Sequence, residues 1–402
     1  MEFSTDTDVL IVGAGPAGLA CAIELGKKNI AVLLIDKADF PRDKSCGGGL
    51  GIRSVRLLNE LLPGTDIGSW SAFEEKIPIH EVAVGTPRGY LYPFRAKPVN
   101  GVPPVLGYVA ERRHLDQLLL QKATAFPSVR FLSGLKANSI TEQEKGVRVE
   151  GKNFAFFSKY ALDARGVNIR DSSRRAFALT ATYKGINGNY LQKSRIEFWF
   201  LRPVYPGYLW LFPNPGGLTN TGIYLPPEYS KLPVTSLRDT FFHLIEIHPQ
   251  VRERFSKAEA VTPFKGAWLP LGPSSDHEVC GRILKAGDSA CLVDPLAGEG
   301  IGNALMSGKM AAEYIGNALA QEGNGKVYTE IYRNRIQTTF VPEFIRRRRV
   351  LRIISAFPFW FEILFKKIHK SQELQKMLSD AIQHPKSSKK HTQLFWVWKF
   401  IT

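Results

Sequence analysis

A glycine-rich turn between a strand and a helix is the feature that most constrains the fold of this chain of 402 residues. Residues 8–12 (DVLIV) form an apolar run that predicts a buried parallel strand. The turn GAGPAG follows, then a segment with helical periodicity (LACAIELGKK), then a second apolar strand at residues 31–36 (AVLLID). These segments predict a βαβ unit, which places the chain in the α/β class.

The glycines of this turn have the spacing of a dinucleotide-binding site. Gly13 allows a tight turn, Gly15 lets the backbone approach a pyrophosphate, and Gly18 permits close packing of the helix. The helix N-terminus offers unpaired N–H groups and the positive end of its dipole to phosphates. Asp36 ends the second strand 18 residues after Gly18, where its carboxylate can accept hydrogen bonds from a ribose diol.

The turn alone does not separate NAD from FAD, but a second motif favours FAD. Residues 284–302 (LKAGDSACLVDPLAGEGIG) place Asp288 at the end of a strand and three glycines at the start of a helix. The Asp288 carboxylate can hold a ribityl chain. The helix N-terminus can point toward the pyrimidine edge of a flavin, where reduction builds negative charge.

The remaining segments predict a second sheet inserted into the first domain. Residues 76–110 are short alternating segments with many Pro and Gly, and residues 177–225 are rich in β-branched and aromatic residues with turn signals. We therefore predict a mixed α/β fold: a Rossmann-like two-dinucleotide fold with an inserted antiparallel sheet and C-terminal helices. The predicted domains are an FAD-binding domain (1–75, 111–176 and 277–325), a substrate domain (76–110 and 177–276) and a C-terminal helical region (326–402).

The formal net charge of +16 suits nucleic acid, an anionic membrane surface or a polyanionic cofactor. The basic excess is heaviest near the C-terminus, and a solvated basic helix face is the simplest explanation. The segment at residues 350–370 (VLRIISAFPFWFEILFKKIHK) is typical of an amphipathic helix on an anionic membrane, and equally of a helix that packs on the body of an enzyme. No helix-turn-helix, RNA-recognition or zinc pattern in the sequence supports nucleic acid.

The four cysteines, Cys21, Cys46, Cys280 and Cys291, form no CxxC pair, so neither a disulfide framework nor a metal site is indicated. The sequence shows no signal-peptide pattern and no apolar window of about 20 residues, the length that a spanning helix needs. We expect a cytoplasmic protein, either soluble or peripheral at the inner face of the membrane. The sequence makes no prediction of the oligomeric state.

Three segments carry a resemblance to a known family. GAGPAG, then ALDARG with Asp163 and Gly166, then AGDSACLVDPLAGEG resemble the three signatures of the p-hydroxybenzoate-hydroxylase-like flavoproteins, in the same order. Within that superfamily, PRDKSCGGGL (residues 41–50) resembles the geranylgeranyl reductase branch, which reduces isoprenoid double bonds. The segment YLWLFPNPGG (208–217) is similar to the aromatic–proline segment beside the substrate cavity of that branch. The resemblance covers roughly residues 6–320.

The resemblance implies a role for each matching residue. For the ADP half of FAD it implies Gly13, Gly15, Pro16, Ala17, Gly18, Asp36 and Lys37, and for the phosphate region Arg113 in RRHLD. For the ribityl and pyrophosphate part it implies Gly287 and Asp288, together with Asp163 of the second signature. For the isoalloxazine it implies Pro295, Gly298, Gly300, Ile301 and Gly302, and close to the reactive face Lys44, Ser45, Cys46, Gly47 and Gly48. We expect catalytic roles for Cys46, Lys44, Tyr208 and Trp210.

Two of these expectations have an equally simple alternative. A thiol near a flavin can act as a proton donor or a redox partner, or Cys46 can be a small packing residue. The aromatic residues of the second sheet can wall an apolar cavity, or they can be ordinary sheet packing. They are Trp199, Tyr205, Tyr208, Trp210 and Phe212.

The first functional hypothesis is an FAD-dependent reductase that delivers hydride to a carbon–carbon double bond of an isoprenoid or other lipid-like substrate. The sequence has no second GxGxxG, so NAD(P)H is expected to bind only transiently as the electron donor. The alternative is an FAD-dependent monooxygenase or halogenase acting on an aromatic or hydrophobic substrate, although the WxWxIP segment of halogenases is absent. A third hypothesis, from another class, is a basic membrane- or nucleic-acid-binding protein that retains a flavin for structure.

Overall fold

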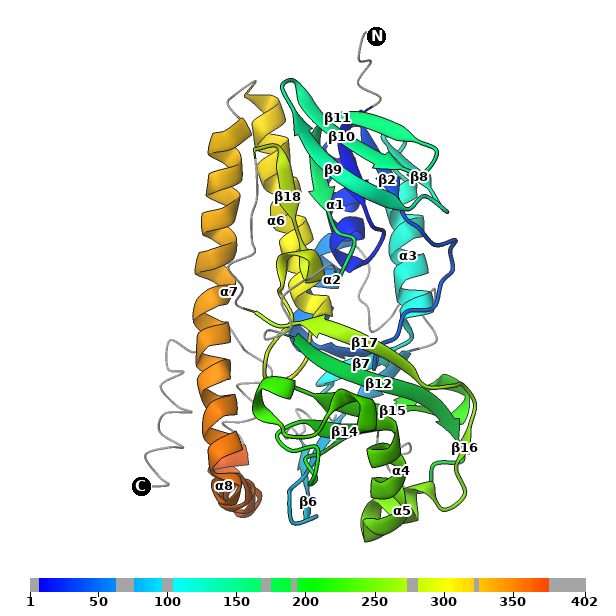
Figure 1. Ribbon diagram of the computed structural model, residues 1–402, viewed down its shortest axis with the longest axis vertical. Coiled ribbons are helices and arrows are strands. Elements are labelled where there is room, and N and C mark those ends of the chain that lie inside the picture. Colours follow the sequence, from blue (N-terminus) through cyan, green and yellow to red (C-terminus); the bar gives the residue numbers. More distant parts are fainter. Residues whose placement is uncertain are drawn as a thin grey trace.

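The predicted βαβ unit lies in the middle of the first of three sheets that the computed structural model forms (Figure 1). The structure describes residues 7–62, 76–95, 104–167, 175–188, 194–272, 281–321 and 325–375. In order across the first sheet, its strands are β8 (Val129–Leu132), β2 (Val32–Ile35), β1 (Thr7–Val12), β11 (Ala155–Asp163), β10 (Gly146–Gly151) and β9 (Ala137–Gln143), and β18 (Ile283–Lys285) also pairs with β11. The pairs that join β8, β2, β1, β11 and β18 are parallel, whereas β9, β10 and β11 pair antiparallel.

The central strands are apolar along their whole length because both faces of the sheet are covered. Val9 and Ile11 of β1 pack against the helices, whereas Leu10 and Val12 pack on the opposite face against Val149 and other residues of the β9–β10 hairpin. The helices packed in the same core are α1 (Pro16–Lys27), α2 (Ile52–Leu61), α3 (Arg112–Thr124), α6 (Ile301–Ala320) and α7 (Gly325–Ala356). The long α7 runs along one side of the molecule and ends beside α8 (Pro358–Lys370) (Figure 1).

The second sheet joins a segment near residue 90 to segments about a hundred residues further along the chain. Its strands, in order, are β16 (Glu259–Ala260), β12 (Arg175–Lys184), β15 (Leu218–Leu225), β14 (Tyr208–Asn214), β13 (Arg195–Trp199), β5 (Glu81–Gly85) and β6 (Leu91–Arg95), and β17 (Lys265–Pro270) also pairs with β12. One face packs on α4 (Leu237–Ile247) and α5 (Pro249–Phe255), two helices that were not predicted from the sequence. A small third sheet contains β3 (Gly49–Gly51), β7 (Gly107–Ala110) and β4 (Lys76–Ile79).

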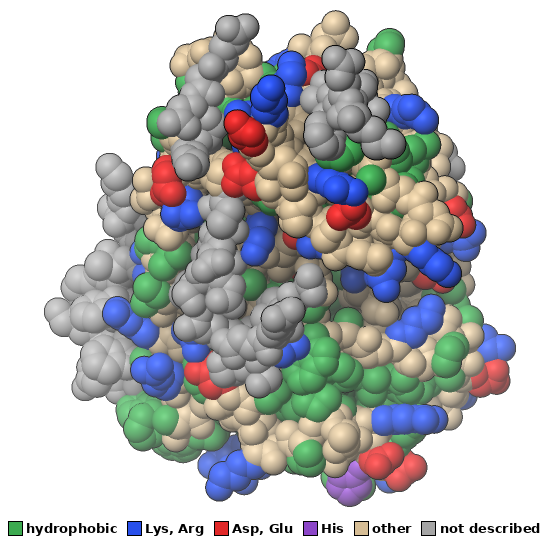
Figure 2. Space-filling model, turned by 45° about the horizontal axis from the view of Figure 1, so that its top comes forward, with side chains coloured by type: hydrophobic (Ala, Val, Ile, Leu, Met, Phe, Trp, Pro, Cys, Tyr) green, Lys and Arg blue, Asp and Glu red, His purple; other side chains and the backbone are tan. Residues whose placement is uncertain are grey.

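The predicted fold class is confirmed: the mixed α/β chain has a Rossmann-like first sheet, a largely antiparallel second sheet and C-terminal helices. The domain boundaries themselves remain a prediction, and residues 376–402 of the predicted helical region lie outside the described residues. No helix in the described ranges is long and apolar enough to cross a membrane. Lys and Arg side chains lie at many places on the face that Figure 2 shows, as the net charge of +16 requires.

The contact between α1 and α6 gives a stability prediction. A Cβ atom added at Gly308 of α6 would lie 2.0 Å from the carbonyl oxygen of Ala17 in α1. Gly308→Ala should therefore lower the free energy of unfolding by about 1–3 kcal/mol, because the backbones must move apart. Gly316→Ala in the same helix is the control, because its Cβ would meet the flexible end of Lys28 at 2.9 Å. Thermal unfolding followed by circular dichroism compares the two, and equal effects would contradict the prediction.

Candidate functional site

The glycine turn after β1 has the shape that a pyrophosphate requires. Gly13 has a φ of 109°, and a Cβ there would lie 2.3 Å from the carbonyl oxygen of Ala164. A Cβ at Gly18 would lie 1.9 Å from the carbonyl oxygen of Gly13, so the first turn of α1 must pack directly on the loop. At Gly15 an added Cβ would meet nothing nearer than Arg42 Nη2, at 3.9 Å, which leaves open space beside the uncapped end of α1.

Asp36 lies at the end of β2 beside this turn and is buried. The backbone N–H of Ala14 donates to its Oδ2 (2.7 Å), and that of Ala38 donates to its Oδ1 (2.9 Å). Each carboxylate oxygen keeps a further lone pair, so the group can also accept from ribose hydroxyls. Its neighbour Lys37, which was assigned to the same half of the cofactor, is exposed.

The second motif brings another uncapped helix end toward the same region. Asp288 lies in the short helix η5 (Gly287–Ala290), and α6 begins at Ile301 after Gly300 without a side-chain cap. Partial burial raises the pKa of the Asp288 carboxyl, and the nearby charges of Lys44 and Arg112 oppose the rise. Desolvation of its own ammonium group lowers the pKa of Lys44. Because the Lys44 side chain remains in contact with solvent, water screens its interaction with the Asp288 carboxylate.

Arg112, rather than the predicted Arg113, faces this cluster. Its guanidinium makes two hydrogen bonds to Asp116 (2.9 and 2.7 Å), and Arg42 pairs with the same carboxylate at 3.2 Å. Arg112 also lies close enough to Asp288 for their opposite charges to interact, whereas Arg113 is exposed. The signal in the sequence was the Arg–Asp pair four residues apart on one helix face.

Asp163 of the second signature has its carboxylate engaged within the protein. Arg165 donates to its two oxygens at 3.0 and 2.8 Å, and Ser289 Oγ donates to Oδ1 at 3.3 Å. These bonds tie the end of β11 to η5. A direct contact between Asp163 and the cofactor remains a prediction.

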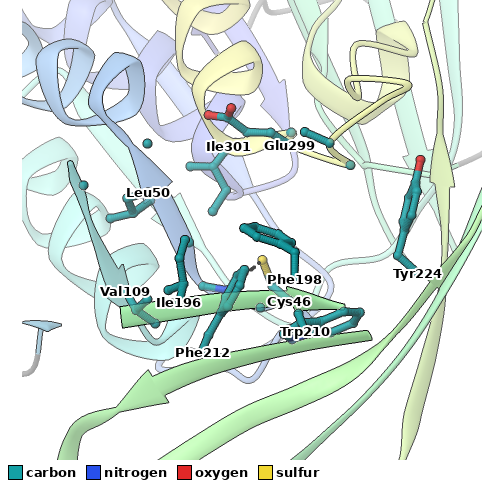
Figure 3. Close-up of a pocket in the computed structure, with 18 of the residues that line it drawn as sticks. Cys46, Leu50, Val109, Ile196, Phe198, Trp210, Phe212, Tyr224, Glu299 and Ile301 are labelled. Atoms are coloured by element: carbon teal, nitrogen blue, oxygen red, sulfur yellow. Dashed lines mark hydrogen bonds between the residues drawn. The ribbon is translucent and has the colours of Figure 1, made fainter. Parts of the chain in front are cut away.

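An apolar cavity of about 280 Å³ lies between the first domain and the second sheet. In Figure 3, Glu299 and Ile301 lie on one side, and Phe198, Trp210 and Phe212 lie on the other, near Cys46. Further lining residues from the strands are Leu50, Ile79, Val82, Val109, Ile196, Tyr208, Tyr224 and Leu269. The predicted residues Ser45, Gly47, Gly48, Gly298 and Gly300 also line it. The predicted Gly302 instead packs on α2, where a Cβ would lie 2.7 Å from Ser54 Oγ.

The Cys-Gly-Gly-Gly segment packs directly on the aromatic wall of this cavity. A Cβ at Gly47 would lie 3.0 Å from the Phe212 ring and 3.4 Å from Trp210 Nε1. Gly48 has a φ of 76°, and its N–H donates to Cys46 Sγ at 3.4 Å. Glycines at these positions therefore let the backbone reach the wall and leave the Cys46 side chain at the cavity.

Tyr208 and Tyr224 hold the loop that precedes α6. Tyr208 donates its hydroxyl proton to the carbonyl oxygen of Ala297 (2.6 Å), and Tyr224 donates to that of Pro295 (3.1 Å). Burial raises the pKa of Tyr208, with smaller contributions from Asp294 and Cys46, so the hydroxyl stays protonated and can donate. Trp210 donates its Nε1–H to Asn220 Oδ1 at 2.8 Å. The polar groups of Tyr208 and Trp210 thus both have partners within the protein. The catalytic roles of these two residues remain predictions.

The residues of the site fit FAD. Two uncapped helix N-termini, open space at Gly15, and carboxylates at Asp36 and Asp288 match the phosphates and the two polyol parts of the molecule. The apolar cavity lies where the glycines before α6 meet the Cys46 segment, which suits a planar ring system. Arg42, Tyr224 and Glu299 were not predicted from the sequence, because their positions at the site depend on contacts between distant segments.

The two neighbouring arginines give a test of the cofactor site. Arg112→Gln should weaken FAD binding by about ten- to hundredfold, the cost of one charged hydrogen bond. Arg113→Gln, the matched control, should bind FAD as the wild type does, because its side chain is exposed. Titration of the FAD-free protein with FAD, followed by flavin fluorescence, measures both constants. The reverse order of effects would support the role first predicted for Arg113.

The two tyrosines give a second test. Tyr208→Phe and Tyr224→Phe each remove one hydrogen bond to a loop carbonyl, so each should destabilise the folded protein by about 1–3 kcal/mol. We expect the two variants to have the same unfolding temperature as each other and the same affinity for FAD as each other. If Tyr208→Phe alone also slows the reaction of the reduced flavin with substrate, its hydroxyl has the catalytic role that the resemblance implied.

Comparisons with known proteins agree with this site. A family model described as an FAD binding domain matches residues 6–165. The menaquinone reductase of Mycolicibacterium smegmatis is 26% identical over 88% of this chain and 85% of its own length. Digeranylgeranylglycerophospholipid reductase 1 of Methanococcoides burtonii is 25% identical over 83% of this chain and 80% of its own length.

Solved structures share the fold. A geranylgeranyl bacteriochlorophyll reductase-like protein from Thermoplasma acidophilum superimposes with a TM-score of 0.79, at 20% identity, over 96% of this chain and 98% of its own. A flavin-dependent brominase has a TM-score of 0.71, at 19% identity, over 94% and 93% of the two chains. The resemblance found in the motifs is confirmed: the chain is an FAD-dependent oxidoreductase with the fold of the geranylgeranyl reductase-like flavoproteins.

Proposed function

We propose that this protein reduces carbon–carbon double bonds in an isoprenoid or other lipid-like substrate. The observation that carries the proposal is that Cys46 and the glycine loop before α6 line one apolar cavity. The names of two relatives support it, since one is a menaquinone reductase and another a digeranylgeranylglycerophospholipid reductase. Both names denote reductases of molecules with isoprenoid chains.

The walls of the cavity suit a chain that has no polar groups. Phe198 packs edge-to-face on Tyr208 (5.2 Å between ring centroids) and on Phe212 (5.3 Å). Tyr208 and Tyr224 stack at 5.0 Å. With the hydroxyl protons of both tyrosines donated to the loop, their rings present apolar faces. Such a surface gains free energy from an isoprenoid chain and excludes water from the reacting atoms.

The chemistry divides between the cofactor and the chain. FAD, when it is bound and reduced, supplies the hydride equivalent. The chain orients the double bond and supplies the proton that completes the addition, and Cys46 Sγ is the candidate donor in the cavity. The thiolate that remains lies near the positive charges of Lys44 and Arg112, and solvent returns its proton. One hydride and one proton thus add across the double bond.

The electron donor and the place of action complete the proposal. NAD(P)H is the proposed transient donor, since it carries the hydride that the flavin needs. A lipid substrate would bring the protein to the inner face of the cytoplasmic membrane, as a peripheral protein.

The test is anaerobic reduction of the FAD-loaded protein by NADPH, NADH or dithionite, followed by mixing with a geranylgeranyl lipid. The lipid should reoxidise the flavin, and Cys46→Ala should slow that step by about 10²–10⁴-fold, the usual contribution of a general acid. Cys46→Ala should leave FAD affinity and reduction by dithionite unchanged, which separates proton donation from packing. An unchanged rate would make Cys46 a packing residue.

Mixing the same reduced protein with oxygen in place of the lipid tests the alternatives. If oxygen alone reoxidises the flavin and an oxygenated or halogenated product forms, a monooxygenase or halogenase replaces the reductase. The structural similarity of the brominase shows only a shared fold. Binding to polyanions with a steep salt dependence, and no turnover with any donor, would favour the third hypothesis.

A further inference from the structure

One end of the molecule, where α7 meets α8, exposes large aromatic side chains to solvent. Phe357 lies in the turn between the two helices and is 55% exposed, and Phe359 and Trp360 in the first turn of α8 are 58% and 36% exposed. Rings of this size are usually buried in a folded protein. A group of them on one surface indicates contact with something apolar.

The tip of the β5–β6 hairpin belongs to the same surface. Tyr90 at the tip is 57% exposed, and the Arg88 guanidinium lies 5.8 Å from the centre of the Phe359 ring. Figure 1 shows β6 and α8 together at the lower end of the molecule. We call the surface formed by Arg88, Tyr90, Phe357, Phe359 and Trp360 the aromatic end.

The surroundings of the aromatic end are strongly basic. Residues 344–370 contain eight Lys or Arg residues and a single acidic residue, Glu362. Glu362 is buried and accepts a hydrogen bond from Thr86 Oγ1 at 2.8 Å, so it does not offset the charge at the surface. The exposed basic residues here are Arg346, Arg349, Arg352, Lys366, Lys367 and Lys370.

The buried side of α8 is connected to the wall of the cavity through packed aromatic rings. Phe361 is buried and packs on Phe200, with 4.9 Å between the ring centroids. Phe200 in turn packs on Tyr208 of the cavity wall at 5.4 Å. The helix therefore carries aromatic residues on both sides, one set facing solvent and one set joined to the wall of the cavity.

We propose that the aromatic end docks on an anionic lipid bilayer. Its rings insert among the acyl chains near the headgroups, and the basic residues of α7 and α8 bind lipid phosphates. In the docked protein, the packed rings of Phe361, Phe200 and Tyr208 lie between the bilayer, which holds a lipid substrate, and the cavity. The docking surface rests on the proposed function only for the identity of that substrate, since membrane binding can be measured without turnover.

The test is cosedimentation of the FAD-loaded full-length protein with vesicles of phosphatidylglycerol and phosphatidylcholine. The wild type should bind these vesicles and should bind pure phosphatidylcholine, or mixed vesicles at high salt, much more weakly. The double variant Phe359→Ser with Trp360→Ser should reduce binding to the mixed vesicles by about tenfold or more. The matched control, Val327→Ser with Ile331→Ser, removes two exposed apolar groups from the other end of α7 and should bind as the wild type does.

Loss of vesicle binding in the aromatic variant, but not in the control variant, supports the proposal. The proposal is also supported if the aromatic variant still reduces a detergent-dispersed substrate but no longer reduces the same substrate in vesicles. Absence of binding by the wild type, or equal binding by the aromatic variant, overturns it. A dimer that becomes a monomer in the aromatic variant, by light scattering, with vesicle binding unchanged, overturns it in favour of a contact between two copies. Vesicle binding without reduction of any lipid leaves the docking surface intact and counts against the proposed function instead.

Discussion

The loop between η5 and α6 is the point at which the first domain, the second sheet and α7 all meet. Asp294 in this loop is buried, and its Oδ1 accepts the backbone N–H groups of Leu296 and Ala297 at 2.8 and 2.9 Å. Its Oδ2 pairs with Arg347 of α7 at 2.6 Å. A carboxylate buried from solvent needs all of these partners, because an unpaired buried charge costs several kcal/mol of folding free energy. The geometry of the loop therefore depends on α7 being in place.

The second sheet fixes the same loop from the opposite side. Tyr208 donates to the carbonyl oxygen of Ala297 and Tyr224 to that of Pro295. A Cβ at Gly298 would lie 3.1 Å from the ring of Tyr224. The glycine keeps the loop close to the tyrosines, and the tyrosines keep their polar groups out of the cavity. The loop before α6 and the aromatic wall of the cavity are thus one connected unit, so a displacement of the second sheet would also displace the loop.

The site combines a polar half with an apolar half, and the two have different physical tasks. Around Gly15, Asp36, Asp288 and Arg112, hydrogen bonds and charges match the phosphates and hydroxyls of a dinucleotide. Around Cys46 and the aromatic wall, few polar groups remain, so a lipid-like substrate can displace water there without leaving buried donors unpaired. The aromatic layer from Tyr208 through Phe200 to Phe361 continues this apolar half to the surface under α8.

The sequence by itself determined the parts of the site that depend on neighbours in the chain. The turn with Gly13, Gly15 and Gly18 and the carboxylate of Asp36 followed from spacing, because a βαβ unit brings them together locally. The segment of Cys46 followed from the resemblance to the geranylgeranyl reductase branch. Only the tertiary structure decided that Arg112 faces the site while Arg113 faces solvent, since successive helix residues point about 100° apart and periodicity does not fix which side is covered. It also decided that β5 pairs with β13, and that the Tyr208 hydroxyl meets Ala297, 89 residues away. Such contacts arise from the packing of distant segments, which local pattern does not encode.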